Sequence, residues 1–224
     1  MTQGRDWFED SRFATQLGAR VVDRSGAEPR IQGFDVTSDL ARHFTFAEMA
    51  LIALTGAEPT ETVSTALQRA LVLLSPIGVE SAPSHLGVLT RLVSQSHAAS
   101  VGTAANVLAQ QAAACVAERA QLLDALREGG VPVLGTTTGG TTGSLGALFE
   151  NCSRIAQQPW FVCLDQLSAA IAILFECGLR ENWQLESALF LAWCPCVMAE
   201  VGSCQNDPIE SYPINLPRFR YAKR

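Results

Sequence analysis

The spacing of apolar residues along this chain is helical over most of its length. The first clear helix face has apolar residues at positions i, i+3, i+4 and i+7: Phe46, Met49, Ala50 and Ala53. Thr45 precedes this face and Glu48 follows it by three residues, which is the spacing of a capping box. Gly56 is typical of a helix C-terminus. We therefore predict a helix that begins after Thr45 and ends at Gly56.

Further apolar stretches of helical length follow, and Pro, Gly and Ser residues separate them. They predict helices over residues 59–74, 83–94, 98–125, 145–157, 161–177 and 181–201. Pro195 lies inside the last stretch and is expected to kink or divide that helix. Before the first helix, residues 21–26 and 30–36 have the pattern of two short extended segments around a polar turn. The chain is therefore predicted to be all-α with a short N-terminal hairpin.

One segment departs from the helical pattern. Residues 128–146 read EGGVPVLGTTTGGTTGSLG, and so many Gly and Thr residues are unfavourable in a helix. Backbone N–H groups and hydroxyls in such a loop can bind a phosphate or a carboxylate, so the candidate binding residues are Gly135, Thr136, Thr137 and Thr138. The alternative is a flexible connecting loop, and the GK[ST] sequence of a phosphate-binding P-loop is absent.

The composition narrows the classes of protein that fit this pattern. The chain has 224 residues, of which 48% are hydrophobic and 17% charged, against about 25% charged residues in typical soluble domains. Disorder is therefore excluded, and a large core, an oligomer interface or both are indicated. The net charge is −6. An acidic chain argues against general nucleic-acid binding, which needs a basic face.

The sequence also bears on location and on metals. The start of the chain leads into no apolar run, and the uncharged stretch 129–149 is too polar to cross a membrane. We therefore expect a cytoplasmic protein with no membrane partner. Seven Cys residues without a paired CxxC, and only three His residues, predict buried reduced thiols and no metal site.

Three blocks of sequence resemble the citrate synthase superfamily, and the nearest branch is the short bacterial citryl-CoA lyase-type members. The first block joins residues 31–36 to residues 46–60, where the family has an Arg-Gly-Tyr hairpin and then a Phe-x-Glu helix that ends in a Leu-x-Gly-x-x-Pro turn. Here Gln32 and Phe34 replace the usual Arg and Tyr. The second block runs from Pro83 into the helix predicted over residues 98–125, and the third covers residues 161–200.

The resemblance implies where acyl-CoA chemistry would take place. The family uses a carboxylate to move a proton at the carbon next to a thioester, and His residues stabilise the charge that develops. Asp165 matches the family's catalytic Asp, although Cys163 and Leu164 replace the Asn-Val before it. The three places where the family has His, which are residues 110–118, 131–138 and 76–78 here, contain none.

The resemblance also implies a division into domains. Residues 1–125 and 160–224 correspond to the family's large helical domain. Residues 126–159 are expected to be the remnant of a much reduced small domain, which would otherwise cover a substrate and exclude water. The Gly- and Thr-rich loop then either binds ligand or replaces deleted structure.

Two interpretations of function follow. In the first, the protein is a non-catalytic or partner-dependent acyl-CoA-binding paralogue with a degenerate site. In the second, it is an active acyl-CoA carbon–carbon lyase or Claisen-type condensing enzyme with Asp165 as base and with replaced donors, such as the loop 136–142 or His97. Arg218 and Arg220 are candidates for contacts with CoA phosphates. The expected ligand is acyl-CoA or CoA with no covalent cofactor, and the expected assembly is a homo-oligomer, with a catalytic partner subunit as a further option.

Overall fold

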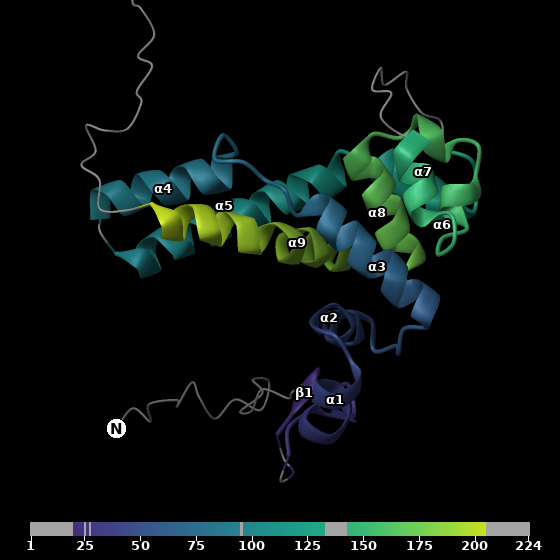
Figure 1. Ribbon diagram of the computed structural model, residues 1–224, viewed down its shortest axis with the longest axis horizontal. Coiled ribbons are helices and arrows are strands. Elements are labelled where there is room, and N and C mark those ends of the chain that lie inside the picture. Colours follow the sequence, from purple (N-terminus) through teal and green to yellow (C-terminus); the bar gives the residue numbers. More distant parts are fainter. Residues whose placement is uncertain (1–19, 25, 27, 95, 133–142, 205–224) are drawn as a thin grey trace, which may run out of the picture. The chain divides into compact units, whose positions relative to one another are not determined.

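A computed structural model describes residues 20–204 of the chain except residues 25, 27, 95 and 133–142 (Figure 1). The chain divides into two units, Met1–Glu58 and Pro59–Arg224. The division predicted from the sequence, with a small domain over residues 126–159, stays a prediction.

The first unit holds a small sheet and short helices. Its strands β1 (Val22–Asp23), β2 (Arg30–Ile31) and β3 (Phe34–Asp35) form an antiparallel sheet in the order β1-β2-β3. A π-helix (Val36–Leu40), α1 (Ala41–His43) and α2 (Phe46–Thr55) follow. Thr45 and Glu48 form the predicted capping box, and Gly56 ends α2 in the left-handed conformation with φ 74°. The predicted hairpin and first helix are therefore confirmed.

The second unit is helical. Its α-helices are α3 (Glu61–Leu74), α4 (Ala82–Ser94), α5 (His97–Ala117), α6 (Ala120–Glu128), α7 (Gly143–Phe149), α8 (Gln166–Glu176) and α9 (Asn182–Ser203). Two 3-10 turns, Ile155–Gln157 and Phe161–Cys163, lie between α7 and α8. Helices α4, α5 and α9 pack side by side, and α3 packs on α8 and α9 (Figure 1). The prediction of an all-α protein is confirmed.

Two features of this unit show how its helices pack. All eight residues from 168 to 175 in α8 are buried, so this helix forms the centre of the core. Helix α4 approaches α5 and α9 at Gly87, where an added Cβ would lie 2.4 Å from Val201 and 2.9 Å from Ala104. Only a residue without a side chain permits this close approach.

The helix boundaries differ from the prediction at four places. The stretch 98–125 is two helices, because Arg119 takes the non-helical angles φ −107° and ψ 19° between α5 and α6. The stretch 161–177 becomes helical only at residue 166, because Asp165 caps α8. Helix α7 ends at Phe149, whose carbonyl accepts hydrogen bonds from the N–H groups of residues 152 and 153. Pro195 lies inside α9 without dividing it.

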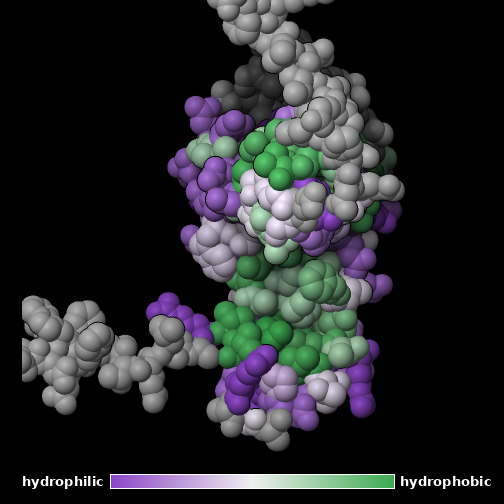
Figure 2. All heavy atoms as spheres, turned by 90° about the vertical axis from the view of Figure 1, so that its left-hand side faces the viewer, coloured by the Kyte–Doolittle hydropathy of each residue, from purple (hydrophilic) through white to green (hydrophobic). Residues whose placement is uncertain are grey.

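Hydrophobic side chains are found both in the core and on the surface. Among the described residues, α9 is long and apolar enough to cross a membrane by length and composition. It packs against α3, α4, α5 and α8, and 39% of its apolar stretch is buried inside the protein. Exposed hydrophobic groups are visible on the face drawn in Figure 2. The most exposed large hydrophobic residues that the structure describes are Phe46, Val72, Val93 and Val131.

Candidate functional site

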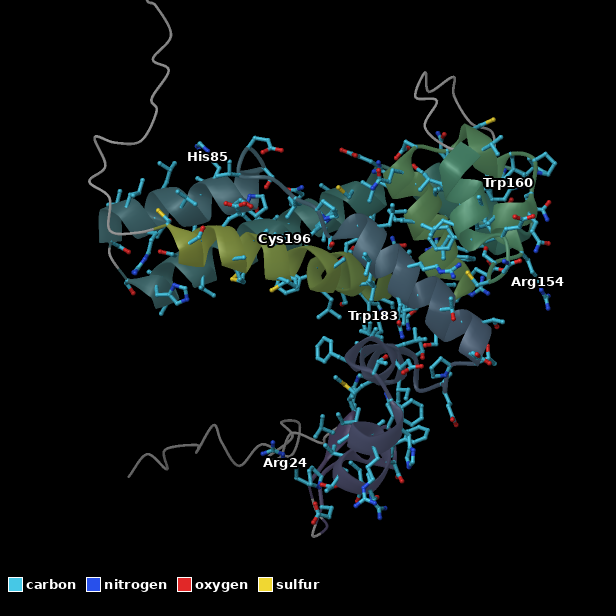
Figure 3. All side chains as sticks on the ribbon, viewed as in Figure 1. Arg24, His85, Arg154, Trp160, Trp183 and Cys196 are labelled. Carbon is cyan, nitrogen blue, oxygen red and sulfur yellow. The ribbon has the colours of Figure 1, made fainter. Side chains whose placement is uncertain are left out.

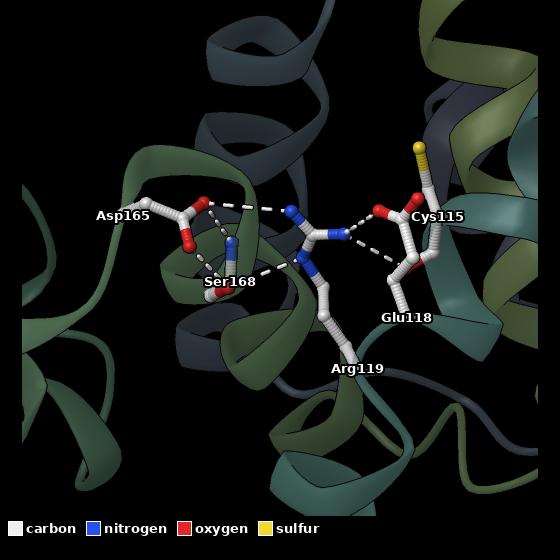
Figure 4. Close-up of polar contacts among 5 residues, drawn as sticks. All are labelled: Cys115, Glu118, Arg119, Asp165 and Ser168. Atoms are coloured by element: carbon white, nitrogen blue, oxygen red, sulfur yellow. Dashed lines mark hydrogen bonds and ion pairs between the residues drawn. The ribbon is translucent and has the colours of Figure 1, made fainter. Parts of the chain in front are cut away.

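Asp165 is the N-cap of α8, and its carboxylate is held by Ser168. Oδ1 accepts a hydrogen bond from the Ser168 backbone N–H at 3.0 Å, and Oδ2 accepts one from the Ser168 hydroxyl at 2.5 Å (Figure 4). Capping of this kind satisfies an N–H group that would have no partner inside the helix. Each carboxylate oxygen of Asp165 is therefore occupied by a donor from the helix that it starts.

Arg119 supplies the positive charge of the site. Its Nε donates to Ser168 Oγ at 3.1 Å, and its Nη2 lies 3.7 Å from Asp165 Oδ1. The third nitrogen, Nη1, donates to the Cys115 carbonyl at 2.9 Å and lies 3.3 Å from the Glu118 carboxylate (Figure 4). The Arg119 side chain is only 17% exposed. The mostly buried guanidinium of Arg119, which lies between α5 and α6, thus contacts the start of α8.

These contacts set the charge state of Asp165. Partial burial raises the pKa of its carboxyl, but the hydrogen bonds from Ser168 and the positive charge of Arg119 together outweigh burial, and the pKa lies below its usual range. The carboxylate is therefore ionised at neutral pH. Stabilisation of the ionised form also makes it a weak base, because proton uptake must overcome those contacts.

The structure does not bring His97 to Asp165 within one chain. His97 is the first residue of α5 and is exposed, whereas the Asp165 site lies beyond the other end of that helix. A helix of 21 residues is about 30 Å long, far beyond hydrogen-bond reach. His43 lies in α1 of the first unit, and His85 lies in α4.

The remaining candidate residues lie outside the described part of the chain. These are Gly135, Thr136, Thr137, Thr138, Arg218 and Arg220. Within the described ranges, no group of three or more His, Cys, Asp or Glu side chains is arranged to hold a metal ion.

Sequence reasoning identified Asp165 but missed Arg119 and Ser168. Ser168 carries a local signal, because a Ser three residues after a helix-capping Asp can donate back to it. Arg119 carries no such signal, since 49 residues separate it from Ser168 and only the tertiary fold brings the two together.

Comparisons with known proteins agree with this fold. No family model and no curated protein matches the sequence. Among solved structures, citryl-CoA lyase from Hydrogenobacter thermophilus is similar over 93% of this chain and 96% of its own, with a TM-score of 0.63 and 14% identity.

Two longer enzymes match over part of their length. ATP citrate lyase from Methanothrix soehngenii, in complex with citrate and coenzyme A, matches 94% of this chain with a TM-score of 0.56 and 12% identity. A variant of the Methanosaeta concilii ATP citrate lyase, in complex with (3S)-citryl-CoA, matches 94% with a TM-score of 0.54 and 13% identity. This chain spans 43% of each.

The comparisons establish the fold. The chain has a citryl-CoA lyase-like helical fold, as the three sequence blocks predicted. The Hydrogenobacter enzyme and this chain cover each other almost completely, so their lengths are nearly the same.

Proposed function

We propose that this protein binds acyl-CoA or CoA and performs no carbon–carbon bond chemistry on its own, as a non-catalytic or partner-dependent relative of citryl-CoA lyase. One observation carries the proposal: Ser168 and Arg119 engage the Asp165 carboxylate as a helix cap and an ion pair. A carboxylate held in this way is suited to structure more than to proton abstraction.

The histidine positions support the same proposal. The two His residues of the second unit, His85 in α4 and His97 at the start of α5, are not at the α6–α8 end where Asp165 lies. Loss of one donor aimed at a developing negative charge typically costs about 10² to 10³ in rate. A site without its usual His donors therefore either receives donors from a partner chain or is not catalytic.

Ligand binding is proposed from the fold. The similar ATP citrate lyases were solved with coenzyme A and with citryl-CoA, so the CoA part of such a ligand is the chemistry to test. The apolar, charge-poor composition of the chain supports assembly into a homo-oligomer.

A second function has its own support. The Asp165 side chain is 43% exposed, so a substrate can reach it, and the chain is as long as a citryl-CoA lyase. In this alternative the protein is an active citryl-CoA lyase-type enzyme, or a citrate synthase-type acyltransferase that converts the acyl group into an alkyl group on transfer. Asp165 would then be the base.

One set of measurements separates the two functions. The purified full chain is mixed with CoA, acetyl-CoA and citryl-CoA, and both the melting temperature and thioester cleavage are followed. We expect CoA to raise the melting temperature of the wild-type protein while citryl-CoA stays intact. Cleavage that Asp165→Ala abolishes, and that Asp124→Ala on the exposed face of α6 leaves unchanged, would establish the enzyme. If the protein shows no CoA binding and no thioester cleavage, both functions are rejected.

A further inference from the structure

A pocket of about 670 Å³ lies at the other end of α8 from Asp165. Three segments form it: the N-terminal end of α3, the loop 151–157, and the end of α8 with Arg180 after it. Its volume is in the range of pockets that bind small molecules. Helix α8 has 11 residues and is therefore about 16 Å long, so this pocket is separate from the Asp165 site.

Two arginines line the pocket, and neither guanidinium has a carboxylate partner among the described residues. Arg154 and Arg180 are both exposed. The Arg154 side chain extends away from the helices (Figure 3) and makes no hydrogen bond or ion pair within the described part of the chain. The Arg180 guanidinium lies 4.2 Å from the centre of the Phe175 ring, which leaves its edge available for an anion.

The carboxylate of Glu176, the acidic residue of the pocket, is hydrogen-bonded to the loop that carries Arg154. Glu176 accepts hydrogen bonds from the backbone N–H groups of Arg154 at 2.9 Å and Ile155 at 3.2 Å, and from the Ser153 hydroxyl. These contacts fix the loop that carries Arg154. The adjacent Cys177 is a neutral thiol, because burial, followed by the charge of Glu176, raises its pKa to about 12. The pocket therefore retains an excess of positive charge.

Neutral groups complete the lining. Asn151 is exposed on the loop and has no side-chain hydrogen bond within the described residues, so its amide is available as a donor. The N-cap of α3, Thr60, and Thr62 in its first turn also line the pocket, at the end of the helix that favours negative charge. Val63 and Ala66 form an apolar wall on the same helix.

We propose that this pocket binds a small phosphorylated molecule, with its phosphate contacted by Arg180 and by Arg154 once the exposed Arg154 side chain turns towards the pocket, and with its organic part against Val63 and Ala66. Planar guanidinium groups match phosphate oxygens in charge and in geometry. The volume exceeds that of a phosphate group and leaves room for the rest of such a molecule. The site does not depend on acyl-CoA binding at Asp165.

The test uses the full chain with inorganic phosphate as probe and succinate at equal ionic strength as the comparison. Titration calorimetry gives the affinity, and the side-chain amide signal of Asn151 in a nitrogen–proton NMR spectrum reports the location. Arg154→Gln and Arg180→Gln remove one guanidinium each. Arg42→Gln, on α1 of the first unit, makes the same change in net charge outside the pocket.

We expect saturable phosphate binding that shifts the Asn151 signal, weakens about tenfold or more in Arg154→Gln and in Arg180→Gln, and is unchanged in Arg42→Gln. The melting temperatures of Arg154→Gln and Arg42→Gln should match the wild type, since these side chains are exposed, whereas Arg180→Gln should lose only the contact with the Phe175 ring. Equal affinity in every variant would overturn the proposal, because it would indicate a general salt effect. Binding of succinate as tight as that of phosphate would overturn the assignment to a phosphate group.

Discussion

Nη2 of Arg119 lies 3.7 Å from Oδ1 of Asp165, so the residue that separates α5 from α6 pairs with the residue that begins α8. Ser168 lies between them, because it accepts from Arg119 and donates to Asp165. In this arrangement Asp165 has a structural role as the N-cap of α8.

The capping role of Asp165 predicts a stability cost. Asp165→Ala should lower the free energy of unfolding by about 1 kcal/mol, because the Ser168 N–H loses its acceptor. Asp165→Asn should cost less, since Asn is also a good N-cap. Urea denaturation of the two variants measures the difference. Equal losses would show that capping is not what the carboxylate contributes.

The lowered pKa of Asp165 predicts a pH dependence. Its ionised form stabilises the folded protein above the unfolded pKa of about 3.9, and that stabilisation is lost as the pH falls through the lower folded pKa. The difference in unfolding free energy between wild type and Asp165→Asn should therefore be constant from pH 7 to about pH 5 and shrink in more acidic solution. A difference that grows towards low pH would mean that the pKa is raised instead.

Arg119 is predicted to matter more than an ordinary surface arginine. Arg119→Met removes the bonds to Ser168 Oγ and to the Cys115 carbonyl, and should cost about 1–3 kcal/mol of unfolding free energy. It should also raise the pKa of Asp165, as measured by an NMR titration of the carboxyl group. Arg42→Met, at an exposed site on α1, should change stability by less than about 0.5 kcal/mol. Similar effects of both variants would argue against the Arg119 contacts.

Two glycines in the bundle should respond in opposite ways to the same change. Gly87→Ala places a methyl group 2.4 Å from Val201 and should cost about 1–3 kcal/mol, because the helices must move apart. Gly102→Ala, in α5, meets nothing within 4 Å and should raise stability by about 0.5–1 kcal/mol through the better helix propensity of Ala. Thermal unfolding followed by circular dichroism compares the two.

The thiols should differ in reactivity. Burial raises the pKa of Cys177 to about 12, so this residue has almost no thiolate at pH 8. Cys163 is exposed. Brief treatment of the folded protein with iodoacetamide, followed by mass spectrometry, should therefore modify Cys163 and leave Cys177 intact. Unfolding in urea before labelling should make both react, and early labelling of Cys177 would contradict its burial.

Local sequence signals predicted the elements that local contacts define. The Thr45 and Glu48 capping box and the helix predicted over residues 59–74 are both confirmed, the latter as α3 with Thr60 as its N-cap, because a cap and its first turn are neighbours in sequence. The break at Arg119 was missed, since the helix-forming residues on both sides favour one continuous helix and the contact of Arg119 with Ser168 joins residues 49 positions apart. The pocket near Arg154 was also missed, because α3, residues 151–157 and the end of α8 come together only in the tertiary fold.

The break between α5 and α6 has a consequence for the charge of Asp165 at the start of α8. Arg119 takes its non-helical angles at this break, and its guanidinium contacts Ser168 and Asp165. A variant without these contacts would leave Asp165 without its nearby cation, and the affinity of Asp165 for a proton would rise. The charge at the start of one helix therefore depends on a side chain that lies between two other helices.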